Sequence, residues 1–257
     1  MITNVQEERL IVVSDMHLGS FFCQPQRALA RFFEFACDGR WNICINGDGI
    51  DVIHTSLENI VRETSQMLAR IRQIMPPETA VYYTIGNHDI ILEQYLHTWG
   101  TLRLVPFLNV HSGATRIRIE HGHLYDSFFM NHGPLQEKMT RATTYLLKIY
   151  PPWYHWHRLP RYLKHRSTTL PIVGPFFKRR FEPDDGLRIP GQKPAFIRGA
   201  DELSRRGFDV VIFGHTHQAG VYPLTTGARY MNTGSWFRDP HYVTIDRGVV
   251  ELKAWTL

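Results

Sequence analysis

The 257-residue chain is 43% hydrophobic and 12% aromatic, which supports a globular fold with a sizeable core and excludes disordered and fibrous classes. Its three cysteines lack the spacing of a metal knuckle or a disulfide framework, and no apolar run is long enough to cross a bilayer. The net charge of +5 is uneven, because residues 138–206 carry fifteen Lys or Arg and only five Asp or Glu. With a polar N-terminus and no export signal, we expect a cytoplasmic protein.

Four apolar runs in the chain each end in a turn that carries side chains of metal-ligand type. The first run, Leu10 to Val13, leads into Asp15 and His17. Runs of this kind predict buried strands, and their carboxyl ends are expected to meet at one edge of the fold. The other three are residues 41–46 before Gly47-Asp48, residues 80–85 before Gly86-Asn87-His88-Asp89, and residues 209–213 before Gly214-His215-Thr216-His217.

Helices are expected between these strands. Pro25 to Asp38 has apolar residues at helical spacing, with the proline where a first helical turn accepts it. Thr55-Ser-Leu-Glu58 has capping-box spacing and opens an apolar-periodic run that ends at Pro76-Pro77. After the third turn, Ile91 to Trp99 is expected to form a short helical stretch.

Strand signals return in the next segment. Leu102 to Val110 and Thr115 to Glu120 are predicted strands, and the second ends at His121-Gly-His123. Between residues 126 and 192 the composition turns aromatic and basic; Leu135 to Ile149 is expected to be helical, and repeated prolines follow. We interpret this segment as an insertion that covers the active edge, within a single domain of residues 1–257.

The C-terminal part resumes the alternation of helix and strand. Pro194 to Arg206 is predicted to be a helix that leads into the strand at residues 209–213. Short strands are expected near residues 220–222, 229–231, 241–245 and 249–252, which would complete a mixed sheet system.

Seven side chains with metal-ligand chemistry lie at the predicted strand ends. They are too many for one tetrahedral ion but suit two ions of higher coordination number that share a bridging carboxylate. A mixed nitrogen and oxygen set favours Mn, with Fe, Zn and Co as alternatives, over Mg or Ca. Two such cations would leave a positive centre that attracts an anionic phosphorylated substrate and suits in-line attack on phosphorus. The seven are Asp15, His17, Asp48, Asn87, His121, His215 and His217.

The order of the motifs, Asp-x-His, Gly-Asp, Gly-Asn-His-Asp, His-Gly-His and Gly-His-x-His, resembles the calcineurin-like metallophosphoesterases. The resemblance implies a four-layer α/β or α+β fold, in which helices flank a central β-sandwich of mixed sheets and a helical insertion forms a lid. It implies that Asp48 bridges two metals and that His88 is the catalytic histidine, oriented by Asp89. One metal would be held by Asp15, His17 and His217, and the other by Asn87, His121 and His215.

Within that superfamily the chain is most similar to the UDP-2,3-diacylglucosamine diphosphatase group. The shared features are Gly47-Asp48-x-x-Asp51, the stretch His121-Gly-His-Leu-Tyr-Asp126 and an apolar, basic insertion before the last histidine motif. His88 stands where the well-known bacterial diphosphatase has an arginine, and His123 where an aspartate is usual. The resemblance implies hydrolysis of a nucleotide-linked lipid to UMP and an acylated sugar phosphate.

Further residues are candidates for substrate binding, each with a structural alternative. Asp51 could instead cap the following segment or hold the Asp48 loop, and His123 could support a ligand or be solvated. The insertion could pack a small core of its own, contact an anionic membrane surface, or bind nucleic acid, which is the less favoured partner. Other functions left open are a nuclease, a nucleotide phosphodiesterase and a non-catalytic binding protein. The full candidate set is Asp51, His123, Asp126, Trp153, Trp156, Arg158, Arg161 and Lys164.

Overall fold

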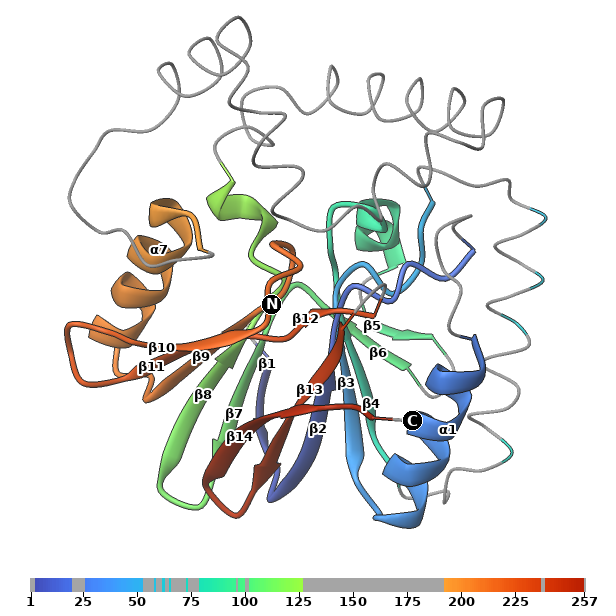
Figure 1. The fold of residues 1–257 in the computed structure, drawn as a ribbon, viewed down its shortest axis with the longest axis horizontal. Coiled ribbons are helices and arrows are strands. Elements are labelled where there is room, and N and C mark those ends of the chain that lie inside the picture. Colours follow the sequence, from blue (N-terminus) through green and yellow to red (C-terminus); the bar gives the residue numbers. More distant parts are fainter. Residues whose placement is uncertain are drawn as a thin grey trace, which may run out of the picture.

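The structure is a computed structural model of the chain, and it describes residues 3–19, 26–52, 79–95, 97–99, 102–126, 192–236 and 239–256, with isolated positions between 53 and 78. Within these residues, the α-helices are α1 (Gln26–Asp38) and α7 (Pro194–Arg205). Two 3₁₀ helices, η1 (Ile90–Tyr95) and η2 (His123–Tyr125), follow strands near one edge of the fold (Figure 1).

One sheet has six strands in the order β1-β7-β8-β9-β11-β10. β8 and β9 run parallel, with Ile119 level with Ile212, so the residues that follow both strands emerge at the same edge. The strand bounds are β1 Thr3–Gln6, β7 Leu108–Ser112, β8 Thr115–Ile119, β9 Val210–Phe213, β10 Gly220–Pro223 and β11 Arg229–Asn232.

The other sheet has eight strands in the order β12-β13-β2-β3-β4-β6-β5, with β14 paired to β13. β2, β3, β4 and β6 are parallel to one another, whereas β13 runs antiparallel to β2 and β5 antiparallel to β6. The bounds are β2 Arg9–Val13, β3 Asn42–Asn46, β4 Val81–Thr84, β5 His97–Trp99, β6 Leu102–Val105, β12 Gly234–Ser235, β13 Asp239–Asp246 and β14 Val249–Ala254.

The central strands are buried on both faces, which explains their continuous apolar runs. Leu10 and Val12 of β2 share a core with Ile212 of β9, so this face packs against the six-stranded sheet. Ile11, one residue out of phase, packs on the other face with Phe32 of α1. Burying each such side chain contributes about 1.5–3 kcal/mol, and the alternation fixes the register of β2 between the two layers.

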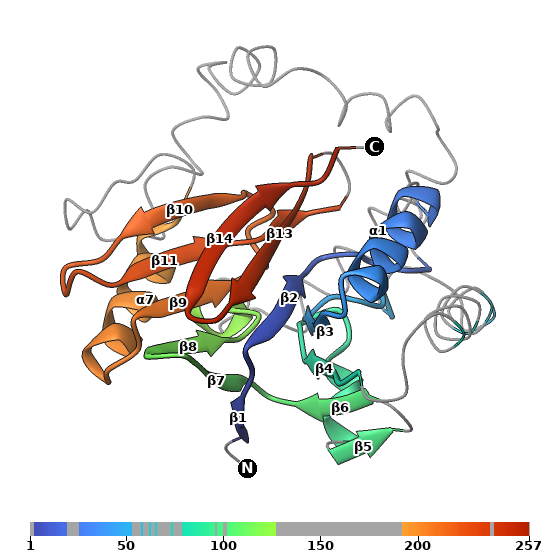
Figure 2. The same ribbon diagram turned by 90° about the horizontal axis from the view of Figure 1, so that it is seen from below.

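The six-stranded sheet has the matching arrangement on its outer face. Phe196 of α7 packs with Phe213 and Tyr230 there. The layers therefore follow the order helix, sheet, sheet, helix, and α1 and α7 lie on opposite outer sides in the view from below (Figure 2). This confirms the four-layer β-sandwich that the resemblance to the metallophosphoesterases implies. In the part of the chain that the structure describes, no helix is long and apolar enough to span a membrane.

Most of the predicted elements are confirmed. The helices expected at Pro25 to Asp38 and Pro194 to Arg206 are α1 and α7, and the strands predicted after the last histidine motif are β10, β11, β13 and β14. The apolar runs before the histidine and carboxylate turns form β2, β3, β4 and β9, all buried.

Two predictions differ from the structure, and one strand was missed. The strand expected at Leu102 to Val110 divides around Pro106 into β6 and β7, which belong to different sheets, because proline has no N–H to continue a ladder. The helical stretch expected at Ile91 to Trp99 is η1 followed by β5, whose pairing with β6 overrides a helical pattern. The polar residues Thr3–Gln6 form β1, which was not predicted and lies parallel to β7 at the sheet edge.

Two predicted helices fall on other parts of the chain. The helix expected from Thr55 to Pro76 lies outside the described residues except at isolated positions, and the one at Leu135 to Ile149 lies wholly outside them.

Candidate metal centre

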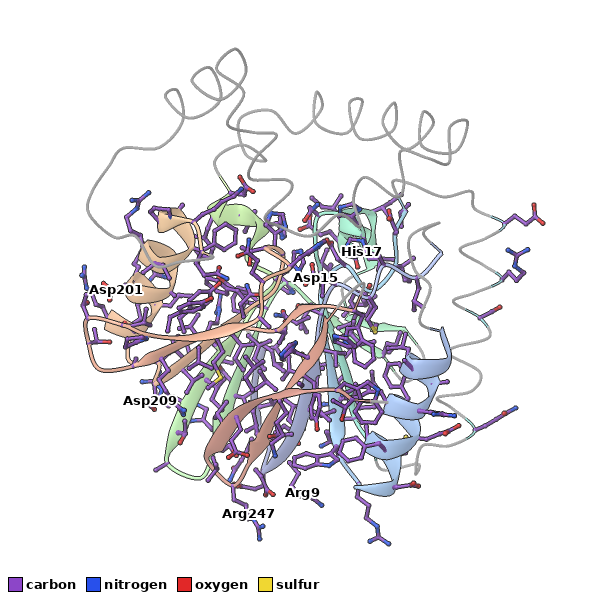
Figure 3. The ribbon with its side chains drawn as sticks, viewed as in Figure 1. Arg9, Asp15, His17, Asp201, Asp209 and Arg247 are labelled. Atoms are coloured by element: carbon purple, nitrogen blue, oxygen red, sulfur yellow. The ribbon has the colours of Figure 1, made fainter. Side chains whose placement is uncertain are left out.

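The turns that follow five strands meet at one edge of the two sheets. In Figure 3, Asp15 and His17 lie at this edge, and Arg9 and Arg247 lie at the opposite one. β2, β3 and β4 are parallel to one another, and β8 is parallel to β9, so the carboxyl ends of the strands in each sheet lie at the same edge of that sheet. The contributing residues are Asp15 and His17 after β2, Asp48 after β3, Asn87 after β4, His121 after β8, and His215 and His217 after β9.

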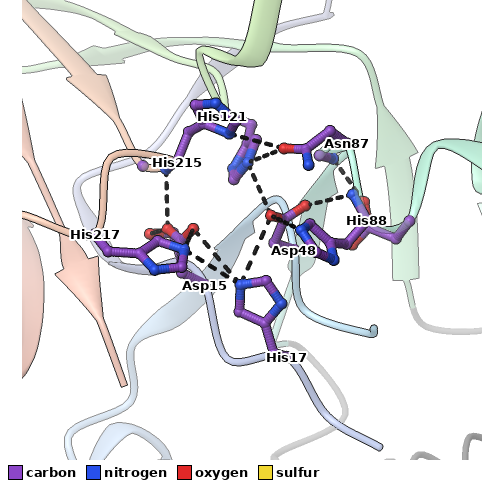
Figure 4. A network of polar contacts seen from close by, with 12 residues as sticks. Asp15, His17, Asp48, Asn87, His88, His121, His215 and His217 are labelled. Carbon is purple, nitrogen blue, oxygen red and sulfur yellow. Dashed lines mark hydrogen bonds and ion pairs between the residues drawn. The ribbon is translucent and has the colours of Figure 1, made fainter. Parts of the chain in front are cut away.

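Asp15, His17 and His217 form one group of potential ligands (Figure 4). His217 Nε2 lies 3.0 Å from Asp15 Oδ1 and 3.4 Å from His17 Nε2, so two imidazole nitrogens and a carboxylate oxygen face a common point. Burial would raise the pKa of Asp15, but the adjacent His217 holds it below its usual value. The aspartate is therefore ionised and can hold a cation with the two imidazoles.

Asn87, His121 and His215 form a second group. Asn87 Oδ1 lies 2.8 Å from His215 Nδ1 and 3.3 Å from His121 Nε2. The two rings come from different strands of the six-stranded sheet, while the amide follows β4 of the other sheet, so this group lies across the junction of the sheets.

Asp48 lies between the two groups. Its Oδ2 is 3.3 Å from His121 Nε2 and 3.7 Å from His17 Nε2. Burial would raise the pKa of Asp48, but His121 and His88 hold it well below its usual range. Conversely, burial would lower the pKa values of those histidines, but Asp48 raises them to about 10 for His121 and about 9 for His88. A carboxylate in this position can bridge two cations.

The outer nitrogens of the inward-facing rings contact acceptors. His121 Nδ1 lies 3.0 Å from the carbonyl oxygen of Asn46, and His215 Nε2 lies 3.2 Å from Asp126 Oδ2. An acceptor at one ring nitrogen stabilises the tautomer that leaves the other nitrogen with a lone pair, which is the form that binds a metal.

The partner of His88 differs from the prediction. His88 Nδ1 lies 3.1 Å from Asp51 Oδ1, and the second oxygen of Asp51 lies 3.6 Å from His17 Nδ1. The carboxylate of Asp89, predicted to orient His88, instead accepts from the backbone of Gly86 and Gly49 and from the hydroxyl of Tyr83. Three such donors hold Asp89 in the loop behind the site, so Asp51 is the carboxylate in contact with the His88 ring.

Asp89 has an unusual charge environment. Burial and the nearby Asp48 raise its pKa to about 7. Its role in the structure is to fix the loops that carry Asp48 and His88, through the hydrogen bonds to Gly49 and Gly86.

Two further candidates, from the stretch His121 to Asp126, lie behind the centre. His123 is 6% exposed and its ring centroid lies 5.6 Å from that of His121, which excludes the solvated alternative. Burial, with the neighbouring His121, lowers its pKa to about 3. Burial would raise the pKa of Asp126, but hydrogen bonds from His215 and Lys193 hold it well below its usual range.

The backbone of the site is strained. Among the described residues, seven non-glycine residues have positive φ, and five of them are potential ligands. Such conformations cost of order 1 kcal/mol each and persist where the surrounding structure enforces them, commonly at functional sites. The five are Asp15, His17, Asp48, His215 and His217.

Glycines let these turns approach each other. A Cβ at Gly86 would lie 2.1 Å from Asp48 Oδ1, and one at Gly214 would lie 2.5 Å from Asp15 Oδ2. The glycines of the motifs are thus required by the ligands of a neighbouring turn, which a sequence pattern alone does not reveal.

The donor set fits two divalent cations. Asp15 Oδ1 is buried and accepts no hydrogen bond within the described residues, although two imidazole nitrogens lie within 4.0 Å of it. The raised pKa values around Asp48 show that the site stabilises positive charge. Nitrogen and oxygen donors in two groups that meet at one carboxylate match the chemistry of a dinuclear centre.

Sequence reasoning missed the contacts that support the ligands. Gln192 and Lys193 bond to the last histidine loop and to Asp126, and their position directly before Pro194, at the start of a helix, was the available signal. The candidates in the insertion lie outside the described residues: Trp153, Trp156, Arg158, Arg161 and Lys164.

Comparison with known proteins gives consistent matches. A protein-family model, described as calcineurin-like phosphoesterase, matches residues 8–219. A UDP-2,3-diacylglucosamine hydrolase from Shewanella piezotolerans is 22% identical over 247 residues, covering 95% of this chain and 97% of that protein. Among solved structures, a dimetal phosphatase from Danio rerio matches with a TM-score of 0.49 and 12% identity, over 96% of this chain and 95% of that one. Vps29 from Entamoeba histolytica complexed with Zn²⁺ matches with a TM-score of 0.41 and 14% identity, over 96% and 97% of the two chains.

Proposed function

Since this chain belongs to the calcineurin-like phosphoesterase family, we propose that it hydrolyses a phosphoester or pyrophosphate bond of a nucleotide-linked lipid, with Mn²⁺ as its metal. The chain is a metal-dependent phosphoesterase, and the substrate and metal are the proposed part. A UDP-2,3-diacylglucosamine-like molecule is favoured because the relative that bears that substrate's name is matched over 95% of this chain.

The observation that carries the proposal is the convergence of donors from both sheets on Asp48. Asp15, His17 and His217 would hold one cation, Asn87, His121 and His215 the other, and Asp48 both. When bound, two divalent cations supply positive charge that polarises phosphoryl oxygens and lowers the pKa of a coordinated water.

His88 supplies a proton in this proposal. Asp51 contacts its Nδ1, which leaves Nε2 facing the centre, 3.9 Å from Asp48 Oδ2. A raised pKa of about 9 keeps the ring protonated at neutral pH in the metal-free chain. We infer that Nε2 donates a proton to the leaving oxygen as the phosphorus–oxygen bond breaks, while the oxygen of a water molecule bonds to phosphorus and one proton of that water passes to solvent.

For a nucleotide-linked lipid, the products would be UMP and an acylated sugar phosphate. We place the reaction in the cytoplasm, at the inner face of a membrane, because the substrate carries acyl chains. The basic, aromatic composition of residues 138–206 supports contact with an anionic surface.

A substrate panel tests the proposal. Protein loaded with Mn²⁺ is assayed on UDP-2,3-diacylglucosamine, bis-p-nitrophenyl phosphate, p-nitrophenyl phosphate and single-stranded DNA, and then with Fe²⁺, Zn²⁺ and Co²⁺. We expect the highest kcat/KM on the acylated UDP-sugar, with UMP as a product. Preferential cleavage of DNA, with steep salt dependence, would show that the substrate is a nucleic acid and not a nucleotide-linked lipid. No hydrolysis of any compound by a metal-loaded protein would overturn the enzymatic function.

A further inference from the structure

His215 is held on three sides. Its Nδ1 faces Asn87 in the centre, its Nε2 contacts Asp126 at 3.2 Å, and its ring stacks on Phe196 of α7 with an interplanar angle of 16°. The stacked phenyl ring fixes the plane of the imidazole, while the carboxylate fixes its rotation within that plane. Asp126 and Phe196 together therefore determine where Nδ1 lies.

Asp126 is itself held by the residue that directly precedes α7. Lys193 Nζ lies 2.8 Å from the same Oδ2 that contacts His215. Asp126 is 8% exposed, so its carboxylate is largely out of water and depends on these two partners. The ammonium group keeps the acceptor negative and in place against the ring.

The preceding residue holds the rest of the same loop. Gln192 Nε2 donates to the carbonyl of Gln218 at 3.0 Å, and Gln192 Oε1 accepts from Thr216 at 3.3 Å and from the hydroxyl of Tyr230 at 3.0 Å. Gln192 is also buried. Gln192 thus supports the loop on either side of His217, while Lys193 acts on His215 through Asp126.

We propose that Asp126, braced by Lys193, is a positioning residue that orients His215 toward the metal shared with Asn87 and His121, rather than a substrate-binding residue. The inference rests on the proposed dinuclear function. On this proposal, Lys193 at the amino-terminal end of α7 helps to determine the affinity for this second metal ion.

The test measures metal affinity rather than turnover alone. Wild-type protein and Asp126→Asn are stripped of metal and titrated with Mn²⁺, with calorimetry for affinity and electron paramagnetic resonance for coupling between the two ions. Loss of an outer acceptor of a ligating histidine typically weakens metal binding about 10–100-fold. We expect this loss for one ion only, so that the coupled signal gives way to that of a single Mn²⁺ at intermediate concentrations. Activity should be restored by excess Mn²⁺, with KM unchanged.

Asp201→Asn is the matched control. Asp201 lies on α7 and is as buried as Asp126, but it bonds to Thr225 and Arg205 away from the centre. We expect it to lower the melting temperature while leaving both Mn²⁺ affinities unchanged.

Lys193→Met provides the second variant. The Lys193 side chain is half-exposed, so this variant tests the proposal even if Asp126→Asn does not fold. We expect the affinity for the ion shared by Asn87, His121 and His215 to fall a few-fold. Unchanged Mn²⁺ affinities in the folded variants, or a raised KM at saturating metal, would overturn the positioning role. Failure of the wild-type protein to bind two ions would instead overturn the proposed function.

Discussion

The two sheets contribute different chemistry to the centre. The eight-stranded sheet supplies the inner carboxylates, Asp15 and Asp48, together with the Asn87 amide and the His17 imidazole. Among the described residues, the six-stranded sheet supplies imidazoles to the interior, and the Asp126 carboxylate that follows β8 lies behind a ring. The negative charge of the centre thus comes from the eight-stranded sheet, and the Asp48 carboxylate lies where the two sheets meet.

This difference explains why the site depends on packing between the sheets. Neither sheet alone offers a complete set of ligands for the second group, because Asn87 comes from one side and His121 and His215 from the other. The core shared by Leu10, Val12 and Ile212 holds the sheets in register just below these turns. Replacing a residue where the two sheets meet should therefore reduce activity and metal binding more than replacing a residue that only supports a ligand.

The largest effect is expected at the junction carboxylate. Asp48→Ala removes the oxygen that lies within 3.9 Å of His17, His88 and His121. We expect turnover to fall by at least about 10³-fold and both metals to be lost together, since the bridge contributes several kcal/mol of charge stabilisation. Elemental analysis and a phosphodiester assay check this. Asp246→Ala, at an exposed pair with Arg247, is the control and should retain both properties.

A smaller effect is expected for the proton donor. His88→Ala should lower kcat by about 10²–10⁴-fold, the range for loss of an acid-base group, while both metals stay bound. His88 also forms a donor group with His17 and Asp48, so metal content separates its two possible roles. A variant that has lost an ion would identify His88 as a ligand.

The junction can also be disturbed without removing any functional group. Gly86→Ala places a methyl group 2.1 Å from Asp48 Oδ1, so the carboxylate or the loop must shift. We expect a stability loss of about 1–3 kcal/mol from overpacking and a decrease in kcat of about 10²-fold, because small displacements are costly in a catalytic site.

Gly227→Ala separates these two effects. Its Cβ would meet nothing within 4 Å, although φ is +86°, so only backbone strain of about 1–2 kcal/mol is expected. Denaturant unfolding and steady-state kinetics on both variants provide the comparison. Full activity in Gly86→Ala would show that Asp48 does not need its present position.

The residues were sufficient to predict the converging turns, because buried strands such as Leu10 to Val13 and Val210 to Phe213 are continuously apolar and end in polar motifs. The layered fold was expected only from the resemblance to the metallophosphoesterases. It was insufficient where pairing partners decide the structure. Thr3–Gln6 has Val5 as its single apolar residue, and it becomes a strand by pairing with the edge of β7 while Val5 packs against the core.

The support of the ligands was also beyond prediction from sequence. Asp89 is adjacent to His88 in the chain, yet its oxygens are directed to Gly86, Gly49 and Tyr83. Asp51 reaches the ring because the Asp48 loop folds back beneath it, with the backbone N–H of Asp51 donating to Leu18. Proximity in sequence says little about side-chain direction in loops of this kind.

The smallest of the catalytic effects should separate these two carboxylates, which are both buried and lie in loops that follow strands of the eight-stranded sheet. Asp51→Asn keeps the shape but removes the charge beside His88 and His17, so we expect kcat to fall about 10–100-fold with little change in stability. Asp89→Asn replaces an acceptor oxygen with an amide group, which leaves a buried donor of Gly86, Gly49 or Tyr83 unpaired and should cost about 1–3 kcal/mol of stability. Its kcat, measured well below the melting temperature, should change less than that of Asp51→Asn. The opposite ranking, with Asp89→Asn the slower and equally stable enzyme, would restore Asp89 as the residue that orients His88.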